Sequence, residues 1–189
     1  MRSALSIDPF IFFPVLLLSV IGILGIYSTG FNAELTFYQG MYIKQILWLC
    51  IGLVLFIITL IIPLRVHEVF AYFYYIIAIG LLIGVLVFGS TGGARSMRWF
   101  DLGFFNLQPS EFAKIALVFA LARFLSHYRR KFPNAISIAT VIFLGMIPFG
   151  LVVKQPDLGT ALVFAIITLF MLYWAGLSLF HLFLFVSPL

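Results

Sequence analysis

The chain has 189 residues, of which 64% are hydrophobic and only 9% charged, and its mean hydropathy is +1.22. Soluble domains carry about 25% charged residues, so the composition excludes a soluble globular protein and predicts an all-α integral membrane protein. The net charge of +5 comes from bases spread among helix ends and loops, which predicts no nucleic-acid partner. The single cysteine, Cys50, lies within an apolar run and excludes a disulfide or a cysteine-based metal site within this chain.

Six apolar stretches are long enough to span a membrane, which takes about 20 helical residues. They cover residues 9–30, 43–62, 69–89, 109–126, 135–153 and 158–176. A seventh stretch begins near Ser178 and reaches only about half a span by Leu189. We therefore interpret residues 1–189 as a single transmembrane domain, a polytopic helical bundle. We expect it to be the first part of a longer fold, because an apolar helix that stops within the membrane leaves backbone groups unsatisfied.

The distribution of basic residues predicts the orientation of the bundle. With the N-terminus inside, the inner bases are Arg2, Arg65, Arg123, Arg129, Arg130 and Lys131, and the outer bases are Lys44, Arg95, Arg98, Lys114 and Lys154. The dense basic cluster at 123–131 decides for this orientation, because cytoplasmic loops are enriched in Lys and Arg. The fourth and sixth spans then both run from the outer face to the inner face.

Two short runs, QPSEFAK at 108–114 and QPDLGTA at 155–161, each begin one of these two spans. Proline suits the first helical turn, where its missing N–H costs nothing. We therefore expect Pro109 and Pro156 to stand there, with Glu111 and Asp157 at the positive end of each helix dipole. Two helix N-termini on one outer face form a candidate anion site, to which Gln108 and Gln155 also belong. The alternative is two ordinary helices that happen to begin with proline.

Lys114 lies about a turn and a half inside its predicted span, so it needs an anionic partner. Glu111 shares its helix face at three residues' distance. Asp157 begins a helix from the same side, and we predict an ion pair between Lys114 and Asp157. Such a pair could fix only the helix register, or it could contact a substrate directly; the residues leave both roles open.

The predicted outer loop Ser90–Leu107 holds Arg95 and Arg98 among glycines and aromatic residues. Arginine binds phosphate through two parallel hydrogen bonds, so these two residues are candidates for binding a diphosphate or an anionic lipid headgroup. The alternative is an interfacial loop that anchors to ordinary membrane phospholipid.

The run GARSMRWFDLGFFNLQPSEFAK resembles the signature of the SEDS proteins (shape, elongation, division and sporulation), and KQPDLGTAL resembles their second signature. Leu158 after the aspartate is more similar to the elongation-type, or RodA-type, members than to the division-type, or FtsW-type, members. The family commonly has Gly-Ala-Arg-Arg-Trp where this chain has Gly-Ala-Arg-Ser-Met-Arg-Trp. Which of Arg95 and Arg98 takes each family arginine's role stays open.

The resemblance implies a roughly ten-helix peptidoglycan glycosyltransferase of the bacterial cytoplasmic membrane. It implies polymerisation of glycan strands from lipid II at the outer face, with a class B penicillin-binding protein as transpeptidase partner. It also implies that the family's catalytic acid lies beyond residue 189, so we expect the 189-residue chain to make no polymer alone. Arg95, Arg98, Lys114 and the two helix N-termini are candidates to assist the leaving diphosphate.

Diphosphate chemistry makes a divalent cation, Mg²⁺ or Mn²⁺, a possible cofactor, although the dispersed histidines His67, His127 and His181 predict no protein metal site. Two other functions stay open. One is a transporter that moves a lipid-linked precursor between leaflets, because a charged cavity between helices suits both activities. The other is a scaffold that binds the transpeptidase without catalysis.

Overall fold

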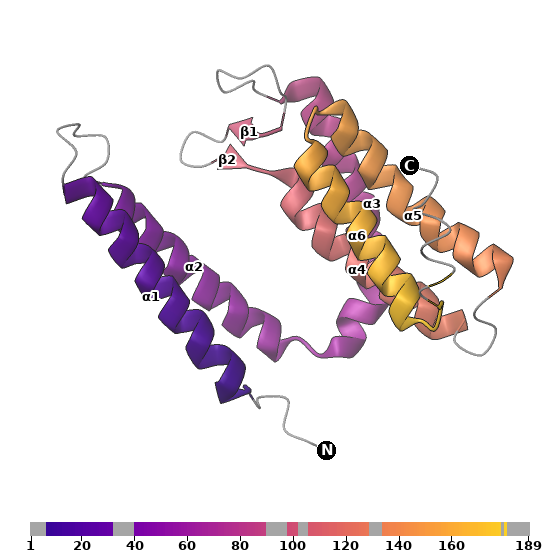
Figure 1. The fold of residues 1–189 in the computed structure, drawn as a ribbon, viewed down its shortest axis with the longest axis horizontal. Coiled ribbons are helices and arrows are strands. Elements are labelled where there is room, and N and C mark those ends of the chain that lie inside the picture. Colours follow the sequence, from indigo (N-terminus) through magenta and orange to yellow (C-terminus); the bar gives the residue numbers. More distant parts are fainter. Residues whose placement is uncertain are drawn as a thin grey trace. The chain divides into compact units, whose positions relative to one another are not determined.

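The computed structural model describes residues 7–31, 40–89, 98–101, 106–128, 134–178 and 180. Six α-helices and one short β-hairpin make up this part of the chain (Figure 1). The helices are α1 (Pro9–Phe31), α2 (Met41–Ile61), α3 (Leu64–Phe88), α4 (Pro109–Tyr128), α5 (Ala135–Lys154) and α6 (Leu158–Trp174). They correspond to the six predicted spans and confirm a polytopic, all-α membrane protein. The predicted seventh span falls mostly outside the described residues.

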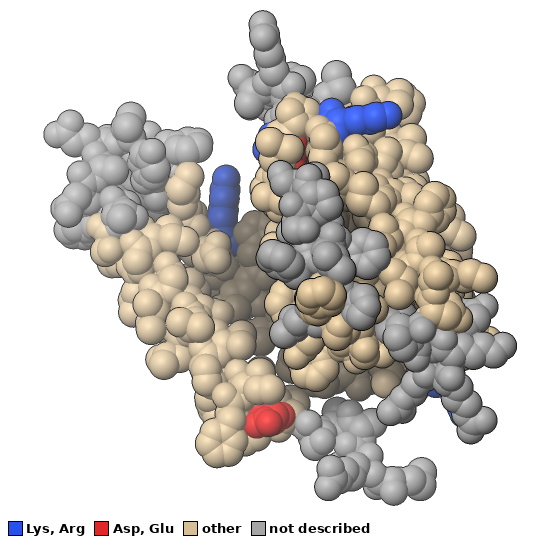
Figure 2. Space-filling model, turned by 45° about the vertical axis from the view of Figure 1, so that its right-hand side comes forward, with Lys and Arg blue, Asp and Glu red and all other residues tan. Residues whose placement is uncertain are grey.

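Four of the helices, α1, α2, α3 and α5, are long and apolar enough to cross a membrane by length and composition. Helix α6 is equally apolar but has 17 residues. Helix α4 has 20 residues and carries Glu111, Lys114 and Arg123. Uncharged side chains dominate the described surface in view in Figure 2, as expected for helices that face lipid.

Helix α3 begins at Leu64, five residues earlier than its predicted span. Its first turns carry Arg65, His67 and Glu68, which a search for apolar stretches passes over. Pro63 precedes the helix and sets this boundary, because proline interrupts the helical hydrogen bonds of the segment before it.

The chain divides into two compact units, residues 1–64 and 65–189. In the first unit, α1 and α2 run antiparallel. Phe12 stacks on Phe56 at a centroid distance of 5.7 Å, and Tyr27 meets Tyr42 edge-on at 5.3 Å. No residue of α2 is buried. The apolar side chains of this pair are therefore half-buried or exposed.

The second unit packs α3, α4, α5 and α6 around a common core. Small residues of α4 fill its centre, and Leu82 and Phe164 are fully buried beside them. Helices α5 and α6 are in close contact at Gly145, where an added Cβ would lie 2.1 Å from the Thr168 hydroxyl oxygen. Glycine is required there because only a bare backbone leaves room for Thr168. Close approach through small residues is common between membrane helices.

A tyrosine compensates for the proline inside α5. Pro148 has no N–H, so it cannot donate to the carbonyl of Leu144 four residues earlier. The Tyr75 hydroxyl of α3 donates to that carbonyl instead, at 2.6 Å. Neighbouring helices commonly satisfy backbone groups that a membrane proline frees. This bond joins α3 to α5 in the core of the second unit.

We expect Tyr75→Phe to lower the free energy of unfolding by about 1–3 kcal/mol, the cost of an unsatisfied buried carbonyl. Thermal unfolding in detergent micelles would measure this loss. Pro148→Ala restores the missing N–H, so the loss from Tyr75→Phe should shrink in that background. Tyr74→Phe is the matched control, because no described residue hydrogen-bonds the Tyr74 hydroxyl. Equal losses from Tyr75→Phe with and without Pro148 would contradict this account.

Candidate functional site

Both Gln-Pro runs lie at one end of the second unit, together with the β-hairpin (Figure 1). The hairpin pairs β1 (Phe100–Asp101) with β2 (Asn106–Leu107), antiparallel, and β2 leads directly into α4. The Phe100 ring packs against Gly84 of α3. A Cβ added to Gly84 would lie 3.4 Å from the ring. The hairpin was not predicted from sequence; only the short apolar–polar alternation on either side of Leu102–Phe105 hints at it.

The two Gln-Pro runs begin their helices differently. Pro109 is the first residue of α4, as predicted. Pro156 lies before α6, in the turn after α5, so its predicted place in the first helical turn is wrong. Asp157 is the N-cap of α6 and not a residue of its first turn, as had been expected. Its carboxylate accepts hydrogen bonds from the Thr160 backbone N–H at 3.2 Å and the Thr160 hydroxyl at 2.9 Å.

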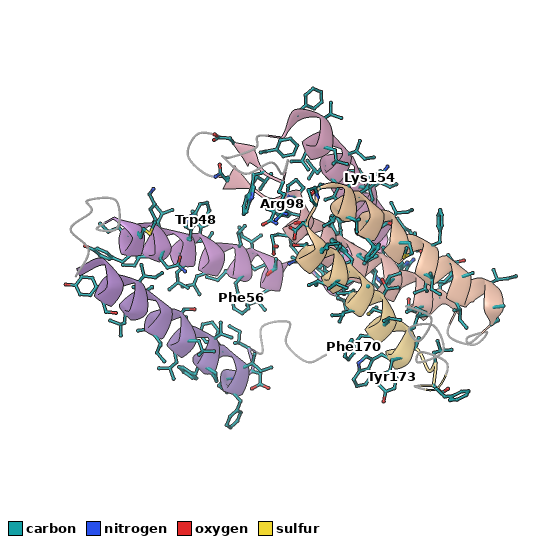
Figure 3. All side chains as sticks on the ribbon, turned by 45° about the horizontal axis from the view of Figure 1, so that its top comes forward. Trp48, Phe56, Arg98, Lys154, Phe170 and Tyr173 are labelled. Atoms are coloured by element: carbon teal, nitrogen blue, oxygen red, sulfur yellow. The ribbon has the colours of Figure 1, made fainter. Side chains whose placement is uncertain are left out.

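Arg98 joins the hairpin to the turn between α5 and α6 (Figure 3). Its Nε donates to the Gln155 carbonyl at 3.1 Å, and an Nη donates to the Pro156 carbonyl. Its other Nη lies 3.6 Å from the Asp157 carboxylate. A cation is favourable beside the carbonyls that end α5, and an anion is favourable at the start of α6. This one guanidinium therefore serves both helix ends.

The ion pairs correct the predicted pairing of Lys114 with Asp157. Lys114 binds Glu111, three residues earlier on α4, at 2.9 Å, and Asp157 binds Arg98. The prediction was wrong because it considered the two helices alone. A partner on the same helix turn was already within reach of Lys114, and the hairpin brings a second cation over the start of α6.

The remaining candidate residues take different places. Gln155 is buried and its side-chain amide donates to the Leu82 carbonyl of α3 at 3.3 Å. Gln108 precedes α4, and its carbonyl accepts from the Glu111 N–H at 3.2 Å. Arg95 lies outside the described residues. The structure thus brings Arg98, Gln155 and Asp157 into contact and keeps Glu111 and Lys114 as a separate pair on α4.

The described residues do not form a metal site. Within residues 7–31, 40–89, 98–101, 106–128, 134–178 and 180, no group of three or more His, Cys, Asp or Glu side chains could hold an ion. Glu111 and Asp157 each bind a base instead. The divalent cation expected from diphosphate chemistry stays a prediction.

A family model described as "Cell cycle protein", which covers FtsW, RodA and SpoVE, matches residues 9–188. The chain belongs to this family. The match confirms the resemblance read from the two Gln-Pro signatures.

Relatives of the family agree with the elongation-type assignment. The peptidoglycan glycosyltransferase MrdB of Escherichia coli K12 is 41% identical over 140 residues, which cover 74% of this chain and 37% of MrdB. The peptidoglycan glycosyltransferase RodA of Treponema pallidum is 37% identical over 184 residues, which cover 94% of this chain and 41% of RodA. The chain thus spans about two fifths of the length of these relatives.

Solved structures of the family share the fold. The crystal structure of the Thermus thermophilus rod shape determining protein RodA matches with a TM-score of 0.83 at 28% identity, covering 97% of this chain and 58% of RodA. A chain of a peptidoglycan synthase complex, described in terms of coordinated polymerisation and crosslinking, also matches with a TM-score of 0.83, at 30% identity. It covers 97% of this chain and 52% of that one.

Proposed function

We propose that this chain supplies the substrate-binding end of a peptidoglycan glycosyltransferase of cell elongation, which polymerises glycan strands from lipid II. Family membership and the activity named for MrdB and RodA support the reaction class. The observation that carries the proposal is the cluster of Arg98, Gln155 and Asp157 at the hairpin end of a bundle whose core is apolar. Ionisable groups at such positions in membrane proteins generally serve function.

In this proposal the hairpin end binds the diphosphate of the lipid-linked sugar. The N-terminus of α4 carries the positive end of a helix dipole, which favours phosphate. Lys114 stands in the second turn of α4 with 26% of its side chain exposed, where it can exchange Glu111 for a phosphate oxygen. Arg98 holds the neighbouring turn in place, and we propose Arg95 as a further phosphate contact. Charge stabilisation of this kind assists a leaving diphosphate.

Glu111 and Asp157 are both paired with basic side chains. We therefore propose no described residue as the general base for the acceptor hydroxyl. We also propose the bacterial cytoplasmic membrane as the location, with the N-terminus inside and the hairpin end outside. Support for this orientation comes from the basic sequence at 129–131, which follows directly on α4; the C-terminal end of α4 lies opposite the hairpin. A class B penicillin-binding protein is the proposed partner; the likeness to a chain of a peptidoglycan synthase complex supports it.

A chimera tests the reaction. The 140 residues of this chain that match Escherichia coli MrdB replace the corresponding segment of that protein, and the purified chimera is reconstituted in vesicles with fluorescent lipid II. We expect glycan polymer without any ion gradient. A folded chimera that moves lipid II between leaflets and makes no polymer would instead support the transporter, and one that binds only the transpeptidase would support the scaffold.

A further inference from the structure

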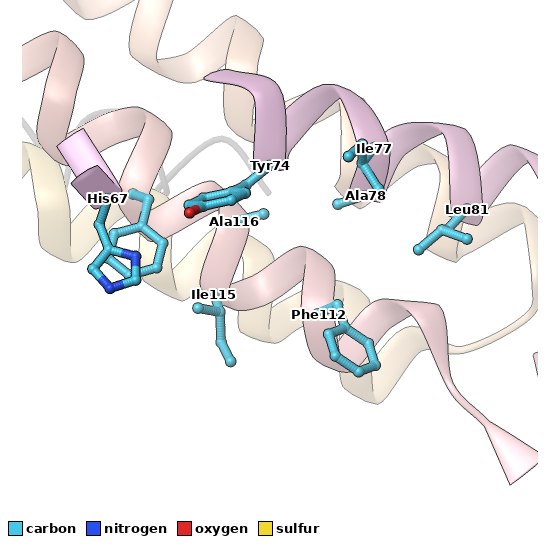
Figure 4. Close-up of a pocket in the computed structure, with 9 residues that line it drawn as sticks. His67, Tyr74, Ile77, Ala78, Leu81, Phe112, Ile115 and Ala116 are labelled. Atoms are coloured by element: carbon cyan, nitrogen blue, oxygen red, sulfur yellow. The ribbon is translucent and has the colours of Figure 1, made fainter. Parts of the chain in front are cut away.

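A groove of about 290 Å³ runs between α3 and α4 at the surface of the second unit (Figure 4). Apolar side chains line it almost throughout, among them Leu81, Phe112 and Ile115. Ile115 is 60% exposed and Phe112 is 52% exposed, so the groove is open at the surface of the second unit. None of its lining residues belongs to the hairpin, to Arg98 or to the Glu111–Lys114 pair.

The polar groups of the groove gather at the end away from the hairpin. His67 of α3 stacks flat on Phe119 of α4 at 5.3 Å, and its Nδ1 is buried without a hydrogen-bond partner among the described residues. Arg123 follows Phe119 by one turn on the same helix face and lies 3.6 Å from Glu68 of α3. An unpartnered buried ring nitrogen is rare and calls for a missing ligand or water.

Helix geometry separates the groove from the proposed diphosphate site. At about 100° per residue, Lys114 projects about 200° around α4 from Phe112, so it points away from the groove. Arg123 falls within about 20° of Phe112 on the same count. The cation on the line of the groove is therefore Arg123, and a head group bound there would sit at the end opposite the hairpin.

The dimensions fit one hydrocarbon chain. His67 and Leu81 are separated by about 21 Å of helix, and Phe112 and Phe119 by about 10 Å. One leaflet of the hydrocarbon core is about 15 Å deep. The length and the apolar lining of the groove suit a slender acyl chain.

We propose that this groove binds one acyl chain of a membrane phospholipid, whose phosphate lies at Arg123 and whose glycerol ester region lies near His67. The loosely paired Arg123 keeps donors free for a phosphate, and guanidinium binds phosphate bidentately. This lipid site is independent of the proposed glycosyl transfer, because the phospholipid would bind at the end of the bundle opposite the hairpin.

Photocrosslinking tests the site. The 189-residue chain is reconstituted in vesicles of phosphatidylethanolamine and phosphatidylglycerol that contain phosphatidylglycerol with a diazirine in its acyl chain. We expect cross-links at Ile77 and Ile115, and their loss when Ile115→Trp fills the groove. Ile166→Trp, at an exposed position of α6, is the matched control. Equal labelling of the exposed faces of α3 and α6 would overturn the proposal, as would preferred labelling of the groove by a diazirine-bearing polyprenyl diphosphate.

Two charge variants separate phosphate binding from a purely structural ion pair. Arg123→Gln should lower groove labelling by about tenfold, the effect of losing one charge-assisted hydrogen bond. Glu68→Gln breaks the same ion pair but keeps the arginine, so it should leave labelling unchanged or raise it. Equal loss in both variants, or no loss in Arg123→Gln, would overturn the assignment of the phosphate to Arg123. Circular dichroism of each variant confirms that the helices remain folded.

Discussion

Replacing Asp157 by alanine is expected to destabilise the second unit by about 2–4 kcal/mol, because the carboxylate has two roles. It caps α6 through Thr160, and loss of an N-cap costs about 0.5–2 kcal/mol. It also pairs with Arg98 at 3.6 Å with 14% of its side chain exposed. A largely buried ion pair that loses one partner costs up to about 3–5 kcal/mol, and the partial exposure of Arg98 reduces that figure.

Asp157→Asn separates the two roles, because asparagine is as good an N-cap as aspartate but carries no charge. We expect Asp157→Asn to cost about 0.5–2 kcal/mol less than Asp157→Ala in thermal unfolding, because asparagine keeps the N-cap and still loses the ion pair with Arg98. In double-mutant cycles Asp157 should couple to Arg98 and not to Lys114. If Asp157 coupled to Lys114 as strongly as to Arg98, the ion pair expected from sequence would be supported and the structure contradicted.

Gly145→Ala is expected to destabilise the contact between α5 and α6 by about 1–3 kcal/mol, the usual cost of overpacking a core. The added Cβ would lie 2.1 Å from the Thr168 hydroxyl oxygen and 2.9 Å from its Cβ. Thr168 is itself held by a bond from its hydroxyl to the Phe164 carbonyl at 2.8 Å, so it cannot turn aside without losing that bond. Each kcal/mol corresponds to a fall of about 2–4 °C in Tm for a domain of this size.

The control for this prediction lies on the same helix. Gly150→Ala meets no atom within 4 Å, and alanine favours a helix over glycine, so stability should hold or rise. Combining Gly145→Ala with Thr168→Gly removes the clashing side chain and should recover part of the loss. A harmless Gly145→Ala would mean that the two helices are not in this close contact.

The helices could be predicted well from the sequence because each membrane span is a continuous apolar run whose length the bilayer sets. The predicted ends of α4 and α5 lie within about two residues of those observed. The start of α3 was missed because its first two turns carry the charged residues Arg65 and Glu68. The hairpin was missed because strands of two residues leave almost no pattern.

The candidate site was harder to predict, for a reason that Arg98 illustrates. Sequence spacing tells which residues share a helix face, and it placed Glu111 beside Lys114. Sequence spacing does not tell which helix end a loop folds over. Arg98 was therefore expected to bind a phosphate, and Asp157 was expected to pair with Lys114. The hydrogen bond from Tyr75 to the Leu144 carbonyl could have been anticipated in part, because a proline inside a span frees the carbonyl four residues before it.

The central claim is that the hairpin end of the α3–α6 bundle binds a lipid-linked diphosphate. The most direct measurement is the Kd of fluorescent lipid II for the 189-residue chain in detergent micelles, compared between the native protein and Lys114→Gln. Arg123→Gln, at the opposite end of the bundle, serves as control. We predict that Lys114→Gln weakens binding about tenfold, the value of one charge-assisted hydrogen bond, and that Arg123→Gln leaves the Kd unchanged. An unchanged Kd in Lys114→Gln, or equal weakening in both variants, would contradict the claim.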